Sequence, residues 1–351
     1  MDGSVMKRII CMFFVLALLK GTIVTASCES AFVSGEAVFE GAKRDYSMYW
    51  METTYDDETG EKYCRMCECN FETGEITYTD VSGYIVAGGI SGDGFYLVDN
   101  NSHVVPIPPE YWLIRLMPFN LYYYSKEGVS LVYENLCIDD LWGVLGYWDN
   151  VLWYASSEHL YPKGVDLITG EEYIYPKKCG EADVESAMDF SPKIFEMLPD
   201  GSLVRCLPDQ YKLERIYLDG HREVLATSTE IRHGQFINIY YHPNSDSVYF
   251  MQHTWISEPV MFEPNYRNTL YRYSLSTGEK VLCRNSDGKA MSLMNAFLAT
   301  VSPDGKDWFV FKYTAENSIL EMYSESADSV QFHYNFHRDI YIDRPFGFIN
   351  H

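Results

Sequence analysis

The chain has 351 residues, of which 47% are hydrophobic and 16% aromatic, and it carries a formal net charge of −23. This composition supplies enough apolar surface for a large core and excludes a disordered chain. The negative charge excludes nucleic acid and anionic membrane surfaces as partners, because both are bound through clustered Lys and Arg.

The first 26 residues have the three zones of a secretory signal peptide. Lys7 and Arg8 precede an apolar run at 9–19, and small residues follow at 25–27. Eleven apolar residues are too few to span a bilayer as a helix, which takes about 20. The sequence therefore predicts cleavage after Ala26 and a mature protein, residues 27–351, that is secreted or associated with the cell envelope.

Cys28 adds an alternative to simple secretion. Together with Thr25, Ala26 and Ser27 it resembles a bacterial lipoprotein box, although Thr25 stands where such a box usually has an aliphatic residue. Lipidation of Cys28 is the one route by which the sequence predicts contact with a membrane.

The first half of the mature chain reads as short strands that alternate with turns. Runs rich in aromatic and β-branched residues are bounded by Gly, Asn and Asp, which is typical of antiparallel strands. The predicted strands are 47–54, 62–70, 76–80, 95–98, 104–107, 120–124, 130–133, 151–155, 164–168 and 173–175.

The second half continues the same pattern. Its clearest unit has four strands at 193–197, 202–206, 214–218 and 222–226. Further strands are predicted at 247–252, 269–274, 280–283, 308–313, 319–324 and 330–334. Helical turns are predicted only at 184–188 and 289–297, and neither segment sustains a 3.6-residue period.

The same turn motifs recur along the whole chain. Thr-Gly-Glu begins at Thr59, Thr73, Thr169 and Thr277, and Asp-Gly begins at Asp93, Asp200, Asp219, Asp287 and Asp304. Glycine accepts the positive φ of tight hairpins, so these motifs predict antiparallel hairpins. Recurrent hairpins indicate an all-β fold, a single-domain β-propeller of four-stranded antiparallel blades, with seven blades favoured and six as the alternative.

One stretch also resembles a known family. Ser302-Pro303-Asp304-Gly305-Lys306 and the strand 308–313, together with the strand and turn at 270–279, resemble the repeats of TolB-like and other WD40-like bacterial propellers. The resemblance implies the propeller fold and carries no active site with it.

Motifs of catalysis and cofactor binding are absent from the sequence. It has no Gly-x-Ser-x-Gly elbow, phosphate loop, dinucleotide fingerprint or calcium loop. Cys64, Cys67 and Cys69 are clustered, but the sequence offers no nearby fourth ligand for zinc, so they are interpreted as buried or disulfide-paired thiols. On a strand, Cys67 and Cys69 would share one face and Cys64 the other. No cofactor or metal is predicted.

The positive functional signal is aromatic. Tyr and Trp side chains bind proteins and sugars through stacking and hydrogen bonding, although strands also use them for packing. We expect a protein or glycan ligand at one mouth of the propeller axis, and the candidate residues lie in loop-like segments: Trp112, Trp142, Trp148, Arg232, His233 and Trp255. The predicted function is a ligand-binding or protein-interaction module. The alternatives are a glycan-directed hydrolase or lyase with acidic residues at the axis, and a structural scaffold.

Overall fold

The computed structural model describes residues 35–351 with thirteen gaps. The gaps are 42, 56–61, 82, 88–90, 101–118, 137–140, 157–161, 175–194, 208–210, 229–234, 257–265, 314–317 and 337–340. Apart from the short 3-10 helix η8 (Pro243–Ser245), the elements in the described part are strands.

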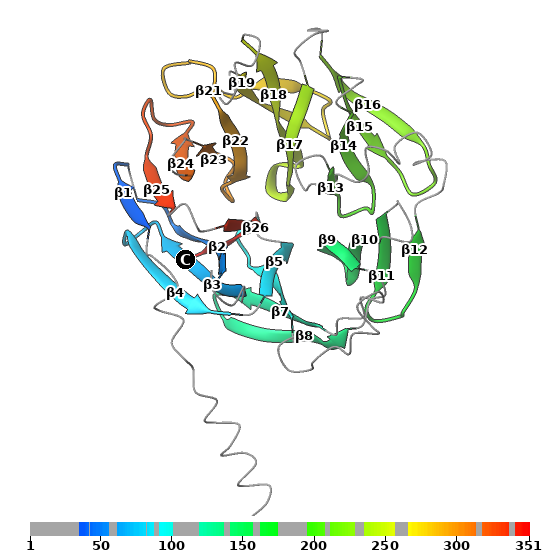
Figure 1. Ribbon diagram of the computed structural model, residues 1–351. Coiled ribbons are helices and arrows are strands. Elements are labelled where there is room, and N and C mark those ends of the chain that lie inside the picture. The colour runs from blue at the N-terminus through cyan, green and yellow to red at the C-terminus, as the bar shows by residue number, and fades with distance from the viewer. Residues whose placement is uncertain are drawn as a thin grey trace, which may run out of the picture.

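The strands form six antiparallel sheets that stand around a common axis as blades (Figure 1). The strands of each blade are given from the innermost to the outermost. Blade 1 consists of β26 (Tyr341–Asn350), β2 (Tyr46–Tyr55), β3 (Lys62–Asn70) and β4 (Glu75–Asp80). Blade 2 consists of β5 (Gly83–Ala87), β6 (Phe95–Asn100), β7 (Phe119–Ser125) and β8 (Gly128–Leu136). Blade 3 consists of β9 (Leu141–Trp148), β10 (Val151–Ser156), β11 (Pro162–Asp166) and β12 (Glu172–Ile174).

The other three blades follow the same plan. Blade 4 consists of β13 (Phe195–Met197), β14 (Leu203–Leu207), β15 (Lys212–Ile216) and β16 (Arg222–Thr227). Blade 5 consists of β17 (Gln235–His242), β18 (Ser247–Trp255), β19 (Tyr266–Ser274) and β20 (Lys280–Leu282), with β21 (Ser292–Met294) also paired to β19. Blade 6 consists of β22 (Ala296–Val301), β23 (Asp307–Tyr313), β24 (Ser318–Ser324) and β25 (Phe332–Phe336), with β1 (Glu36–Phe39) added at its outer edge.

The innermost strands close the ring. Each of β26, β5, β9, β13, β17 and β22 contacts the next in that order, and β22 contacts β26 again. Blade 1 joins the two ends of the chain, because the C-terminal strand β26 pairs with β2 in the register Tyr46↔Asn350 to Thr53↔Tyr341. The protein is therefore a six-bladed β-propeller.

The number of blades corrects the seven that the sequence favoured and agrees with the alternative of six. The clearest predicted unit is blade 4, which runs from Phe195 to Thr227, whereas blade 2 runs from Gly83 to Leu136. Long strands such as β2 and the long connection at 101–118 use chain that a seventh blade would need. The predicted turn at 289–297 is also wrong, since this segment contains β21 and the start of β22; the one at 184–188 and the strand at 104–107 lie outside the described residues.

The recurrent turns lie where the sequence predicted them. Gly74, Gly170 and Gly278 have φ of 77°, 73° and 70°, each between the third and fourth strands of its blade. In two of these turns the preceding Asn70 or Asp166 side chain accepts two backbone N–H groups of the turn. The first Thr-Gly-Glu, at Thr59, lies outside the described residues.

The cysteines of the described part are free thiols, and none forms a disulfide. Cys67 and Cys69 are buried in the core between blades 6 and 1, whereas Cys64 packs against the core between blades 1 and 2. The prediction that Cys64 faces away from the other two is confirmed. Burial raises the pKa of the Cys67 thiol well above its usual value, so this thiol stays protonated and unreactive.

Candidate functional site

The two ends of the propeller axis are built from different parts of each blade. Antiparallel order puts the turns between the first and second strands of the blades at one end, and the segments between second and third strands at the other. We call the first end the locked end, and it is formed around Ser91, Asn244, Pro303 and Asn350.

Asn244 links three blades at the locked end. Its Nδ2 donates to the carbonyl oxygen of Pro303 in blade 6 at 2.9 Å and to that of Ser91 in blade 2 at 3.0 Å. In a ring of six, blade 2 stands opposite blade 5, to which Asn244 belongs. The backbone N–H of Asn350 in blade 1 also donates to Gly92, at 2.8 Å. Segments of four blades therefore meet at this end of the axis.

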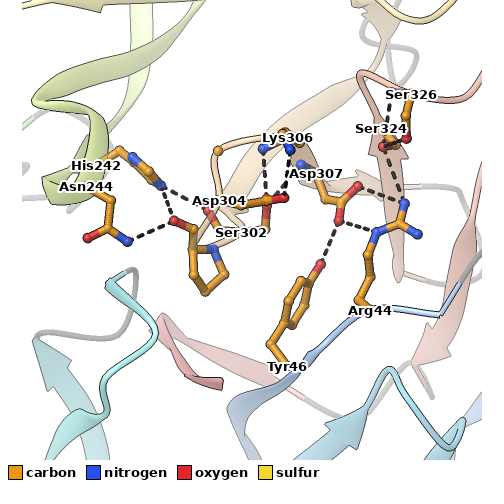
Figure 2. Close-up of polar contacts among 12 residues, drawn as sticks. Arg44, Tyr46, His242, Asn244, Ser302, Asp304, Lys306, Asp307, Ser324 and Ser326 are labelled. Carbon is orange, nitrogen blue, oxygen red and sulfur yellow. Dashed lines mark hydrogen bonds and ion pairs between the residues drawn. The ribbon is translucent and has the colours of Figure 1, made fainter. Parts of the chain in front are cut away.

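The turn between β22 and β23 is the centre of this network (Figure 2). Ser302 Oγ donates to Asp304 at 2.7 Å and accepts the N–H of Asp307 at 2.9 Å. His242 Nδ1 accepts the N–H of Ser245, so its Nε2 carries the proton and donates to Ser302 and Pro303. Burial lowers the pKa of His242, which keeps the imidazole neutral in this structural role.

Asp307 extends the network into blade 1. Its two carboxylate oxygens accept from Arg44 Nε at 2.6 Å and Nη2 at 3.0 Å, and Tyr46 donates its hydroxyl at 2.9 Å. Burial and the neighbouring carboxylate raise the pKa of Tyr46 well above its usual value. These polar groups bind one another, so the cluster holds blades 5, 6 and 1 together and leaves no activated nucleophile or base in it.

Unpartnered polar groups lie on the innermost strands instead. β17 has a bulge between Ile237 and Tyr240, and Asn238 within it has a left-handed φ of 55°. Asn238 is fully buried, and among the described residues neither its amide oxygen nor its nitrogen has a hydrogen-bond partner. Thr300, beside the bulge of β22 in the next blade, is buried and unpartnered in the same way. Buried polar groups without partners are costly, so we expect ordered water at both.

Glu196 is the acidic group of the shortest innermost strand, β13. It accepts the backbone N–H of Tyr241, and burial raises its pKa to about 8, so its carboxyl is protonated at neutral pH. The other acidic residue on the six innermost strands is Asp343, close to the start of β26. Glu196 lies near the locked end, whereas Asp343 is seven residues from Asn350, or about 20 Å along a strand.

The candidate residues from the sequence divide between the two ends. Trp142 is at the start of β9 and Trp255 at the end of β18, so both backbones lie at the end opposite the locked end. Trp112, Arg232 and His233 lie outside the described residues. The strand ends that flank these three residues lie at the same end as Trp142 and Trp255: Asn100, Phe119, Thr227 and Gln235.

Trp148 does not share an end with Trp142 and Trp255. It is the last residue of β9 and is half-buried between two cores, with its ring 6.0 Å from that of Tyr241 in a T-shaped contact. It fits the alternative of packing between blades. The sequence analysis did not identify Asn244 or Asn238. For Asn238 one signal was available, because it is a polar residue inside the apolar run Phe236-Ile237-Asn238-Ile239.

Comparison with known proteins yields similarity in structure alone. No family model and no curated protein matches the sequence. Among solved structures, a nidogen/laminin complex is 9% identical, with 86% of this chain and 98% of that chain covered and a TM-score of 0.44. A putative TolB from Agrobacterium tumefaciens is 10% identical, with 87% and 99% covered and a TM-score of 0.43. A protein from Lactobacillus plantarum is 12% identical, with 83% and 82% covered and a TM-score of 0.40.

TolB proteins are thus among the structures that this chain resembles, as its turn and strand motifs predicted. The likeness concerns the fold alone. In the described part of the chain, no three His, Cys, Asp or Glu side chains are grouped to hold a metal ion, and no helix has the length and apolar character to cross a membrane.

Proposed function

We propose that this propeller is a binding module that takes a protein or glycan ligand at the end opposite the locked end. The observation that supports this choice is the pair of hydrogen bonds from Asn244, which joins opposite blades across the locked end. Loops from several blades converge at each end of a propeller. Binding residues concentrate in loops that a rigid scaffold holds in place. The backbones of Trp142 and Trp255 lie at the favoured end.

Glycan and peptide arrays probed with the purified protein test this proposal. Once a bound probe is found, Trp142→Ala and Trp255→Ala are each expected to weaken its binding by about 1 to 3 kcal/mol with little loss of stability. Trp148→Ala is the matched control, because it removes the same side chain at the locked end and should lower the melting temperature without affecting binding. Equal binding by all three variants would contradict the proposed location.

We also infer that the protein is exported and that the mature chain begins after Ala26. The order of charged, apolar and small residues in the first 26 positions supports this. Mass spectrometry of the protein from its native cells tests it. Intact Met1 would refute cleavage, and a diacylglycerol mass on Cys28 would replace secretion by anchoring at the cell envelope.

A glycan-directed hydrolase is the second candidate, and Glu196 is the observation that favours it. A carboxyl with its pKa raised to about 8 has the protonation state of a general acid at neutral pH. Glycosidases pair such an acid with a second carboxylate within about 10 Å, and Asp343 on β26 is the other acidic residue of the innermost strands. Release of reducing ends from array-positive glycans, abolished by Glu196→Gln, would establish the hydrolase and displace the binding module.

A further inference from the structure

The outer edge of blade 6 carries a strand that the plan of the other blades does not include. In the described part of the chain, β4, β8, β12, β16 and β20 have no strand paired outside them, whereas β25 is paired with β1. Blade 6 has the four strands of the common plan without β1. This strand is therefore an addition to a blade that is already complete.

β1 is short, and only one of its faces rests on the protein. Ala37 packs against the core between blades 6 and 1, and the ring of Phe39 lies 4.9 Å from that of Phe332 and 5.8 Å from that of Phe71. Three of the four side chains of β1 are exposed, among them Val38 (40%) and Phe39 itself (36%). The strand is therefore held by its backbone pairing with β25 and by little buried side-chain area.

Glycines stand at the two ends of β1, and the edge of blade 6 leaves no room for a side chain at either. A Cβ at Gly35 would lie 2.6 Å from the carbonyl oxygen of Asn335, and a Cβ at Gly41 would lie 2.8 Å from Cβ of Gln331. Atoms in favourable contact are about 3.5 to 4.0 Å apart. The same two glycines donate their N–H groups to blade 6, Gly35 to the Tyr334 hydroxyl and Gly41 to the Gln331 carbonyl, each at 3.1 Å.

The edge of β25 therefore selects its strand by sequence. It fits glycine at both ends, a small residue at the position of Ala37 and an aromatic ring at the position of Phe39. In β1 this pattern is Gly-Glu-Ala-Val-Phe-Glu-Gly at residues 35–41. When a peptide adds to the edge of a sheet, backbone hydrogen bonds supply affinity and alternate side chains supply specificity.

The ring does not need β1 in order to close. β26 follows β25 in the chain and completes blade 1 by pairing with β2. Arg44, which lies between β1 and β2, binds Asp307 of β23 and not β25. Elements with few buried apolar contacts open at the lowest free energy in a native protein. β1 can therefore leave the edge of blade 6 while the propeller stays folded.

We propose that the outer edge of blade 6 is a binding site for an extended segment of a partner protein, and that β1 occupies this site in the free protein. The partner segment has the pattern of residues 35–41 and pairs antiparallel with β25 in place of β1. The contact of β1 is autoinhibitory, because a partner must compete with a strand that is tethered beside the site. This site lies on the outer rim and is separate from the one proposed at the propeller axis.

Binding of a labelled peptide to the purified protein tests the site. The probe is the heptapeptide of residues 35–41, and fluorescence anisotropy measures its binding. Phe39→Ala in the protein removes the ring that holds β1, so we expect this variant to bind the probe at least about tenfold more tightly than the wild type. Val38→Ala is the matched control, because it shortens the neighbouring, outward-facing side chain and should bind as the wild type does. A probe with alanine in place of its phenylalanine should bind none of the three.

Gly35→Val is a second variant that releases β1 without removing the ring of Phe39. It should raise the affinity for the probe as Phe39→Ala does, and the far-ultraviolet circular dichroism of both variants should match that of the wild type. If both variants are folded and bind the probe no more tightly than the wild type, β1 does not compete for this edge and the proposal is overturned.

Hydrogen exchange on the wild type tests the displacement of β1 directly. At saturating probe, the backbone amides of β1 should lose protection while those of β25 keep theirs. Protection of β1 that does not change would overturn the exchange of strands. Light scattering distinguishes the remaining occupant of the edge: a wild-type mass of two chains that falls to one chain in Phe39→Ala would assign the edge to β1 of a second copy and overturn the proposal of a partner protein.

Discussion

The contact between blades 6 and 1 and the contact between blades 2 and 3 are built differently. The first contains sixteen buried hydrophobic residues, and Tyr334 of β25 donates to the fully buried Glu52 of β2 at 3.2 Å. Among the residues that the structure describes, the second contains five: Val98, Leu121, Tyr147, Leu152 and Tyr154.

This difference follows from the path of the chain. Blades 2 and 3 are joined directly by the short connection 137–140, which keeps them close at a small entropic cost. Blades 6 and 1 are instead joined where the two ends of the chain meet: β1 pairs with β25 in blade 6 and β26 pairs with β2 in blade 1, so the ring is closed by non-covalent pairing between strands far apart in the chain. The propeller is therefore expected to place most of its stability where the ring closes.

The largest effect is expected from Glu52→Ala. Glu52 forms a buried ion pair with Arg65, 2.6 Å from Nη2, and also accepts from Trp50 Nε1 at 3.1 Å. Removal of the carboxylate leaves a buried guanidinium uncompensated, which costs about 3 to 5 kcal/mol in urea unfolding. The control is Glu52→Leu combined with Arg65→Met, which should recover most of this loss. A loss below about 1 kcal/mol in the single variant would refute the role of the pair.

A paired truncation compares the two contacts directly. Phe332→Ala, between blades 6 and 1, is expected to cost about 3 to 5 kcal/mol, and Leu152→Ala, between blades 2 and 3, about 2 to 3 kcal/mol. Both side chains are fully buried. Hydrogen exchange should show the same order, with β10 exchanging before β25. If β25 opens first, the ring does not depend on its closure for stability.

Glu196 allows a comparison that depends on pH. Its folded pKa of about 8 lies above the unfolded value of 4.5, so the native state holds one more proton than the unfolded state between these pH values. Stability is therefore expected to fall as pH rises through this window, by on the order of 2 kcal/mol from pH 5 to 7. Glu196→Gln should flatten this part of the profile in unfolding measured at each pH. If the pH dependence of stability were the same in Glu196→Gln as in the wild type, the Glu196 carboxyl would be solvated and its pKa would not be raised.

The smallest effect is expected at the locked end. Asp307→Asn weakens the two hydrogen bonds from Arg44 and should cost about 1.5 kcal/mol. Lys306→Ala is the neighbouring control, since its exposed ammonium lies 3.8 Å from Asp304, and it should change stability by less than about 0.5 kcal/mol. Thermal unfolding of both variants measures these two changes in stability. Equal losses would mean that the bidentate contact adds nothing to the turn.

Local patterns predicted the local structure well. The turns at Gly74, Gly170 and Gly278 and the four strands of blade 4 lie where residue types alone placed them. The number of blades was harder to predict from the sequence, because it depends on how many residues each blade uses. The residues of the site were the hardest to predict from the sequence. Trp148 has the same loop-like context as Trp142, yet the two lie at opposite ends of β9.

The sequence by itself determined the class of fold and its hairpins, because a positive φ at glycine and the alternation of apolar residues act between near neighbours in the chain. The tertiary structure alone decided that β26 completes blade 1 and that Asn244 joins blade 5 to blade 2. Each of these depends on residues far apart in the chain that meet only when the ring closes, and no local pattern records such a meeting.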